Sequence, residues 1–162
     1  MADVVDLITQ DHRELERLFR VLLDEPEKRA MTAPVMSTLL FAHSRAEEVE
    51  VYPFARDAGL GEDIEHSQKE HLVADLIAAR LVVTDPTSAA FEQVLRELVE
   101  TVQHHIDEEE GDVLPGMRSS MPSDDLERLA KRFLAARTDN LVGVAGGDRS
   151  EVTRAWAARA EW

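Results

Sequence analysis

The feature that most constrains the fold of this 162-residue chain is an internal repeat. The first half contains QDHRELERLF and then FAHSRAEEVEVYP, and the second half contains KEHLVADLIA and then VQHHIDEEEGDVLP. Pro115 follows Pro53 by 62 residues, and the same offset carries the HxxxE motif at His43 onto the one at His105. Another histidine precedes each motif, by 31 residues in the first half and 34 in the second. The repeat therefore predicts two similar helix pairs, each with a histidine on one helix and HxxxE on the next.

Apolar residues recur at spacings of three and four along most of the chain, which is typical of amphipathic helices, and no segment alternates convincingly like a strand. The expected helices cover residues 3–23, 33–56, 62–83, 87–113 and 123–136. Pro53 is expected to bend or end the second helix. Residues 140–147 (NLVGVAGG) are expected to form a loose connector, and residues 150–162 a short terminal helix or a partly ordered tail. The prediction is an all-α fold, an antiparallel up-down four-helix bundle over residues 1–118, with a C-terminal helix and tail (119–162) packed on it.

Composition excludes several classes of protein. The formal net charge of −15 disfavours nucleic acid and anionic membranes as partners, because their phosphates would be repelled. The lack of cysteine excludes disulfides, thiolate zinc sites and iron–sulfur clusters. No segment is apolar over the length of a membrane span, and the N-terminus MADVVDLITQDH is acidic where a secretory signal would be basic. We expect a cytoplasmic protein, a monomer or weak homo-oligomer with no nucleic-acid or membrane partner.

Six titratable residues are expected to point into the bundle: His12, His43, Glu47, His71, His105 and Glu109. The apolar stripe of each helix runs through its histidine, and residues four apart share a helix face, so each HxxxE pair converges. A lone histidine on an apolar face is more often a hydrogen-bonded core residue than a ligand, but buried carboxylates need paired charges or a metal. Imidazole nitrogens and carboxylate oxygens suit iron, manganese or zinc, and six ligands are too many for one tetrahedral zinc. They fit two metals that take two imidazoles each and share bridging carboxylates.

The other polar residues near these positions are expected to lie outside the site. His104 shares its helical phase with acidic residues on a solvent face. His66 lies about 140° around the helix from His71, which predicts a surface position or a supporting hydrogen bond. Glu48 and Glu110 are expected to be solvated or to line an access path, and Asp107, Glu108 and Asp112 to form a charged exposed face.

Tyr52 is a separate candidate. On a straight helix its phase would turn it away from the site. Because it precedes the helix-bending Pro53, it can instead approach the metals, where it would hydrogen-bond to the site or occupy an open metal position.

The order and spacing of these residues, with the prolines after them, resemble the hemerythrin-like HHE cation-binding family, whose motif is H…HxxxE…H…HxxxE on a four-helix bundle. The resemblance covers residues 3–115. It implies a non-haem di-iron centre with the six inward residues as ligands, that is, two iron ions with an oxo or hydroxo bridge and no haem. Members of the family include reversible dioxygen carriers, oxygen or iron sensors, and proteins that decompose peroxide or handle nitric oxide.

The sequence departs from the oxygen carriers of this family at two points. They have HxxxH on the third helix, where this chain has Ser67 four residues before His71, and HxxxxD on the fourth helix, where this chain has Glu109 four residues after His105. One histidine fewer leaves a metal position open, which favours reactivity over simple reversible binding.

The leading hypothesis for function is a reaction with hydrogen peroxide or dioxygen, with catalase-like peroxide decomposition as the best single candidate. The alternative is a protein that binds or senses oxygen, nitric oxide or iron without turnover. Ferritin-like iron storage ranks last, because the Glu-x-x-His motifs of that class are absent.

Overall fold

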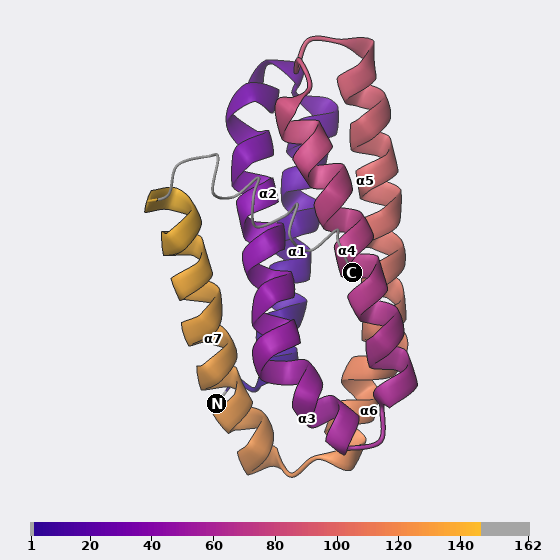
Figure 1. The fold of residues 1–162 in the computed structure, drawn as a ribbon, viewed down its shortest axis with the longest axis vertical. Helices are drawn as coiled ribbons and strands as arrows, with labels where there is room; N and C mark the ends of the chain where they lie inside the picture. Colours follow the sequence, from indigo (N-terminus) through magenta and orange to yellow (C-terminus); the bar gives the residue numbers. More distant parts are fainter. Residues whose placement is uncertain (1, 147–162) are drawn as a thin grey trace.

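The computed structural model describes residues 2–146, with side chains described as far as Val142. Its four long helices form the bundle: α1 (Val4–Asp24), α2 (Arg29–Ala46), α4 (Gly61–Val83) and α5 (Ala89–Glu108). They run alternately up and down, with short connections between them (Figure 1). No strand occurs among the described residues. The predicted all-α, up-down four-helix bundle is therefore confirmed.

The helix boundaries follow from local capping and from one buried arginine. Asp3 caps α1 in a reciprocal box with Asp6, and the Ser88 side chain accepts a hydrogen bond from a backbone N–H at the start of α5. The second helix begins at Arg29 rather than at residue 33 as expected. The buried Arg29 guanidinium donates to the Leu22 carbonyl at the end of α1, which fixes the corner between the two helices.

Two π-helical turns interrupt the helices that carry HxxxE. They are η2 (Glu47–Val51) and η3 (Glu109–Val113), and they lead into α3 (Tyr52–Asp57) and α6 (Leu114–Ser120). In each, the residue after the turn donates its backbone N–H to the carbonyl five residues back, from Tyr52 to Glu47 and from Leu114 to Glu109. A proline ring would clash with the carbonyl four residues earlier in a regular α-helix, and the wider turn places that carbonyl elsewhere. The helix therefore continues past each proline, and the residues after the π turn face a different direction than in a regular α-helix.

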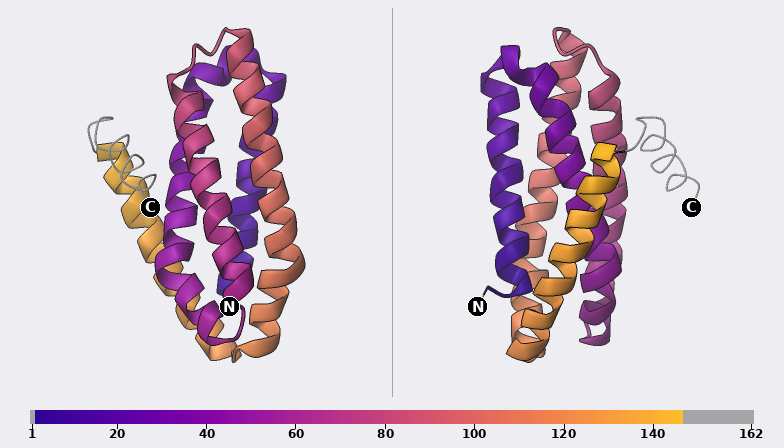
Figure 2. Two further views of the ribbon diagram at one scale, coloured as in Figure 1. Left: turned by 45° about the vertical axis from the view of Figure 1, so that its right-hand side comes forward. Right: turned by 90° about the vertical axis from the view of Figure 1, so that its left-hand side faces the viewer.

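The last described helix, α7 (Ser123–Gly146), lies along the flank of the bundle formed by α1 and α2 (Figure 2). It is longer than the predicted 123–136, and the prediction of a loose connector over 140–147 is wrong for residues 140–146. Beyond Phe133, the last buried apolar residue among the described side chains of this helix, Thr138 and Asn140 donate side-chain hydrogen bonds to the carbonyls four residues earlier. The predicted terminal helix or tail at 150–162 lies outside the described residues.

The buried interior consists of two apolar clusters with polar residues between them along the helices. One cluster gathers residues of α1, α2, α4 and α5 from Leu15 to Ile106, and the other joins the start of α1 to α3, α6 and α7. His12, His43 and His71 lie between members of the two clusters in the sequence of their helices, and His105 lies at the end of the first cluster, next to Ile106. None of the helices within residues 2–146 is both long and apolar enough to span a membrane.

Candidate metal centre

Four buried histidines meet inside the bundle, one from each long helix. His12, His43, His71 and His105 come from α1, α2, α4 and α5, and none is more than 5% exposed. The ring centroids of His12 and His43 are 5.1 Å apart, and those of His71 and His105 are 4.6 Å apart. Each half of the sequence repeat thus supplies one pair of imidazoles.

Two buried glutamates join these pairs. Glu47 and Glu109 are the first residues of the two π turns. Glu47 Oε2 lies 3.4 Å from His43 Nε2 and 3.3 Å from His71 Nε2. Glu109 Oε2 lies 3.3 Å from the Nε2 atom of His12 and 3.8 Å from that of His105. Each carboxylate therefore contacts one histidine of each half, which is the placement that a ligand bridging two metal ions needs.

All six residues predicted as ligands fall into two groups whose potential ligand atoms lie within 4.8 Å of one another. One group is His12, His43, Glu47 and Glu109, and the other is Glu47, His71 and His105. The groups share Glu47, so the geometry can hold two neighbouring cations.

Several atoms at this point have no hydrogen-bonding partner among the described residues. They are His12 Nε2, His43 Nε2, Glu47 Oε1 and Glu109 Oε2. A buried polar atom without a partner costs about 1–3 kcal/mol, and more when it is charged. Because the four residues form one group of potential ligands and suit the same cations, they fit a bound metal and are poorly explained as packing.

The electrostatics of the pocket also favour a cation. Burial and the charge of Glu109 raise the pKa of Glu47 well above its ordinary value. Burial alone would lower the pKa of His12, but the close contact with the charged Glu109 raises it to about 9. Burial lowers the pKa of His43 to about 4. At Glu47 and His12 the raised pKa values favour a bound proton where a metal would supply the positive charge, whereas His43 is kept neutral, the form that binds a metal.

Each inward histidine has an acid on the outer side of its ring. His12 Nδ1 lies 2.8 Å from Glu110, His43 Nδ1 lies 3.3 Å from Asp11, and His71 Nδ1 lies 3.3 Å from Glu48. His105 Nδ1 completes the set, 2.9 Å from Glu70 Oε2. A carboxylate on Nδ1 fixes the tautomer and aims Nε2 at the centre, as it does for histidines that bind metals.

These four acids correct the sequence prediction, which placed Glu48 and Glu110 in solvent or on an access path and did not consider Asp11 or Glu70. A signal was present in the repeat. An acid directly precedes the first histidine of each half, and an acid directly follows each glutamate of HxxxE.

Tyr52 lies fully buried beside the centre. Its hydroxyl is 3.2 Å from Glu109 Oε1, 3.3 Å from His71 Nε2 and 3.4 Å from Glu47 Oε2. A straight α-helix would turn Tyr52 away from the centre. The π turn η2 contains about one residue more per turn, so Tyr52 faces the centre instead. Burial and the charges of the two glutamates raise the pKa of Tyr52 well above its ordinary value, so the phenol stays protonated.

Tyr52 makes the two sides of the centre different. Its counterpart in the repeat, 62 residues later, is Leu114, which is buried in an apolar cluster. Ser67, four residues before His71, is also buried, and its hydroxyl interacts with the Tyr52 hydroxyl. The residue four before His12 is Ile8. The His71 side is therefore polar next to the centre, whereas the corresponding residues of the His12 side are apolar.

Other predicted neighbours lie on the surface. His66 and His104 have side chains 57% and 62% exposed, as their helical phase predicted. Asp107 and Asp112 are exposed as well, and Glu108 is partly exposed.

The α1–α2 side of the centre is covered by α7; the sequence predicted a C-terminal helix on the bundle but not its contact with the centre. The Phe133 ring packs edge-on against His43 with ring centroids 6.0 Å apart. Arg137 Nε donates to Asp11 Oδ2 at 2.6 Å, on the oxygen that also faces His43. The helix thus holds both the ring and its outer carboxylate.

Comparison with known proteins supports this description. The hemerythrin HHE cation-binding domain matches residues 3–116. A DNA nickase from Nostoc sp. is 25% identical over 138 residues, a match that spans 84% of this chain but 39% of that protein. An uncharacterized hemerythrin-like protein from Schizosaccharomyces pombe is 27% identical over 139 residues, which is 82% of this chain and 68% of the yeast protein. No solved structure matches significantly.

The match extends from the cap of α1 to the start of α6 and so includes every residue of the buried histidine–glutamate centre. The chain belongs to the hemerythrin HHE cation-binding family.

Proposed function

We propose that the centre binds two iron ions through His12, His43, Glu47, His71, His105 and Glu109. The donor set supports this assignment, because two imidazoles per ion and shared carboxylates suit iron among the common metals. In this arrangement His12 and His43 hold one ion and His71 and His105 the other, as the two clusters of ligand atoms suggest.

We further propose that the protein decomposes hydrogen peroxide, two molecules giving two of water and one of dioxygen. When bound, the iron pair would supply the exchange of electrons. The observation that carries the proposal is the buried Tyr52 hydroxyl, which lies within 3.4 Å of Glu47, His71 and Glu109. A neutral phenol can donate a hydrogen bond to a small oxygen ligand and can hold a proton next to it.

The two sides of the centre then have different roles. The polar side, with Tyr52 and Ser67 next to His71, is where a small molecule would react. On the His12 side the counterparts of Tyr52 and Ser67 are Leu114 and Ile8, so that side would offer a small molecule no polar group outside the ligands. Glu48 and Glu70 hold the rings of His71 and His105 in place from outside.

A hollow on the same side would bring small molecules close to the centre. A hollow of about 190 Å³ opens between α4 and η3 and reaches Ser67; its other lining residues are Asp63, His66, Glu108, Asp112 and Val113. Since Ser67 interacts with Tyr52, the hollow ends near the reactive side. Its acidic lining suits neutral peroxide or dioxygen better than anions.

A second candidate is binding or sensing of dioxygen, nitric oxide or iron without turnover. The complete burial of the six ligands favours it, because a sheltered centre protects a bound gas from water. We do not propose cleavage of DNA from the likeness to the Nostoc protein, because the net charge of −15 would repel a phosphate backbone. On the sequence grounds given above, we propose a cytoplasmic location.

Peroxide consumption and oxygen release by the iron-loaded protein test the proposal. We expect many turnovers per chain, with one dioxygen released for every two peroxides consumed. The same protein loaded with zinc is the control and should be inactive, because zinc has no redox chemistry. A single stoichiometric oxidation without turnover, or reversible spectral change with dioxygen alone, would favour the second candidate.

A further inference from the structure

The two histidines outside the buried centre also meet acidic residues at one point. His66 and Glu70 are four residues apart on α4, and His104 and Glu108 are four residues apart on α5. Each pair is an HxxxE motif that faces outward, and the antiparallel packing of α4 and α5 brings the two pairs together. All six histidines of the chain thus belong to clusters able to hold a metal.

The distances within this outer cluster are short. His66 Nε2 lies 3.4 Å from Glu70 Oε1 and 3.0 Å from Glu108 Oε2. His104 Nε2 lies 3.6 Å from the same Glu70 oxygen and 3.2 Å from Glu108 Oε1. One ligand atom from each residue lies within 4.8 Å of the others, so four donors surround one position.

No lysine or arginine among the described residues forms an ion pair with either glutamate. The ion pairs of Glu70 and Glu108 are with histidines only, whereas the adjacent Lys69 pairs with Glu65 and the nearby Arg96 pairs with Glu92. The two carboxylates therefore face imidazole nitrogens, which can bind a transition-metal ion together with carboxylate oxygens.

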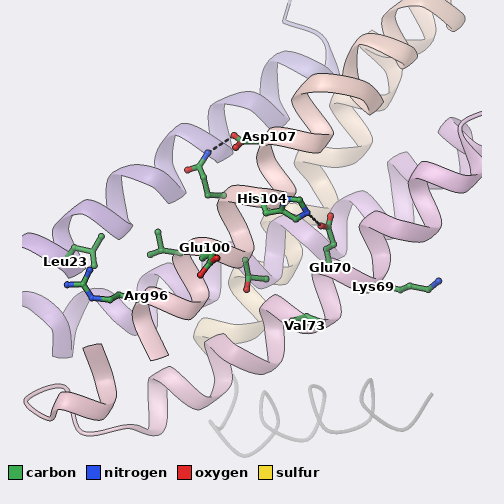
Figure 3. A pocket seen from close by; sticks show the side chains of 11 residues that line it. Leu23, Lys69, Glu70, Val73, Arg96, Glu100, His104 and Asp107 are labelled. Atoms are coloured by element: carbon green, nitrogen blue, oxygen red, sulfur yellow. Dashed lines mark hydrogen bonds and ion pairs between the residues drawn. The ribbon is translucent and has the colours of Figure 1, made fainter. Parts of the chain in front are cut away.

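The cluster lies at the rim of an open groove of about 880 Å³ between α4 and α5. Figure 3 shows His104 and Glu70 pointing toward each other across the two helices, with Glu100 and Asp107 further along the α5 side. The hollow that reaches Ser67 begins on the other side of the cluster, at His66 and Glu108. The position is therefore open to ions from solvent.

We propose that His66, Glu70, His104 and Glu108 form a second, solvent-facing site for one divalent transition-metal ion such as zinc. Two imidazole nitrogens and two carboxylate oxygens make a tetrahedral donor set that zinc accepts. This site requires no metal in the buried centre.

Glu70 links the two sites. Its Oε1 atom faces the outer cluster, and its Oε2 atom lies 2.9 Å from Nδ1 of His105, whose other nitrogen points into the buried centre. A cation on the outer oxygen would draw charge from the inner contact, so binding at one site changes the affinity of the other. This second step rests on the proposed metal binding by the buried centre.

Zinc titration of the full-length protein tests the outer site. In protein whose buried centre has first been filled with metal, the imidazole NMR signals of His66 and His104 should shift with one further equivalent of zinc, and in protein with an empty centre they should shift once zinc exceeds what that centre takes up. The double variant His66→Ala/His104→Ala should bind this zinc about tenfold more weakly or worse, since it lacks two of four donors. The matched control Glu100→Gln/Asp107→Asn removes two nearby acids outside the donor set and should bind as the wild type does. Equal zinc binding by the double histidine variant and the wild type would overturn the outer site.

Two conservative variants test the link. Glu108→Gln should weaken zinc binding and leave retention of the buried metal unchanged. Glu70→Gln should weaken zinc binding and also speed the loss of the buried metal to a chelator. Unchanged retention in Glu70→Gln would overturn the link while leaving the outer site standing, and failure of the buried centre to take up iron would overturn only the function proposed for that centre.

Discussion

At the scale of single residues, the difference between the two halves of the centre lies in Tyr52. The repeat supplies matching imidazoles and carboxylates to both sides, but only one side has a phenol. Its ring stacks on His71 with an interplanar angle of 15° and centroids 5.5 Å apart. Removing the hydroxyl alone therefore separates its chemistry from its packing.

Tyr52→Phe should keep the iron content and the thermal stability, because the ring still packs on His71. Peroxide turnover should fall roughly 100-fold, the usual loss when one preorganised hydrogen-bond donor is removed. Metal content, unfolding temperature and oxygen release measured on one preparation check this. Unchanged turnover would show that the phenol has no part in the reaction.

The outer carboxylates can be tested one at a time. Glu110→Gln replaces the acceptor of His12 Nδ1 by a neutral amide and should weaken the affinity of the buried centre for metal about 10–100-fold. Competition with a chelator at fixed pH measures this affinity. Asp107→Asn, three residues earlier and hydrogen-bonded to Gln103 in α5, is the matched control and should match the wild type. Equal affinities in the two variants would deny the outer acids any role.

Helical phase alone sufficed to predict which histidines face inward, because the residues before each π turn follow a regular α-helix. His104 and His105 are adjacent, yet one is exposed and the other buried, as the 3.6-residue period requires. Tyr52 lies after η2, where one extra residue rotates the chain, so a regular period mispredicts it. The meeting of His66 with His104 depends on how α4 and α5 are aligned, and periodicity within one helix carries no information on that.

At the scale of elements, the π turns set the direction of everything that follows them. Removing one residue from η2 would restore an α-helical period and rotate α3 by about 100° relative to the centre. Because His43 and Glu47 precede the change, they would keep their places.

Deletion of the exposed Val49 should therefore leave metal binding detectable while it removes Tyr52 from the centre and abolishes peroxide turnover. The unfolding temperature should fall as well, because α3 loses its buried face. Val49→Ala keeps the length of η2 and is the control with normal turnover. A deletion variant with full turnover would contradict the role given to the π turn.

The other element that the motif does not include is α7, which packs over the α1–α2 side. Phe133→Ala should lower the free energy of unfolding by about 3–5 kcal/mol, the usual cost of removing a buried phenylalanine ring. It should also speed metal loss, since water would reach His43. Denaturant unfolding and chelator stripping measure the two effects. The neighbouring Leu134 is 48% exposed, and Leu134→Ala should change stability by only about 0.5 kcal/mol or less; similar losses in both variants would contradict the packing described.

At the scale of the whole molecule, the bundle contains polar residues where a protein of this size would otherwise have continuous core. Four imidazoles and two carboxylates between two apolar clusters are unfavourable without a cation, since buried charges need partners. Metal binding would repay this cost and so contribute to folding. The repeat therefore constrains the fold and the site together, because the same six residues would destabilise a bundle that binds no metal.

The most direct measurement of this central claim is the metal content of the purified protein and of two variants at adjacent residues, in zinc-free solution. The wild type loaded anaerobically with ferrous iron should retain two iron ions per chain after desalting in a weak chelator that clears the solvent-facing site. His105→Ala should retain one or none and unfold at lower temperature, whereas His104→Ala should retain both. Less than one metal ion in the wild type, or equal losses in the two variants, would contradict a metal centre built from the inward faces of the four helices.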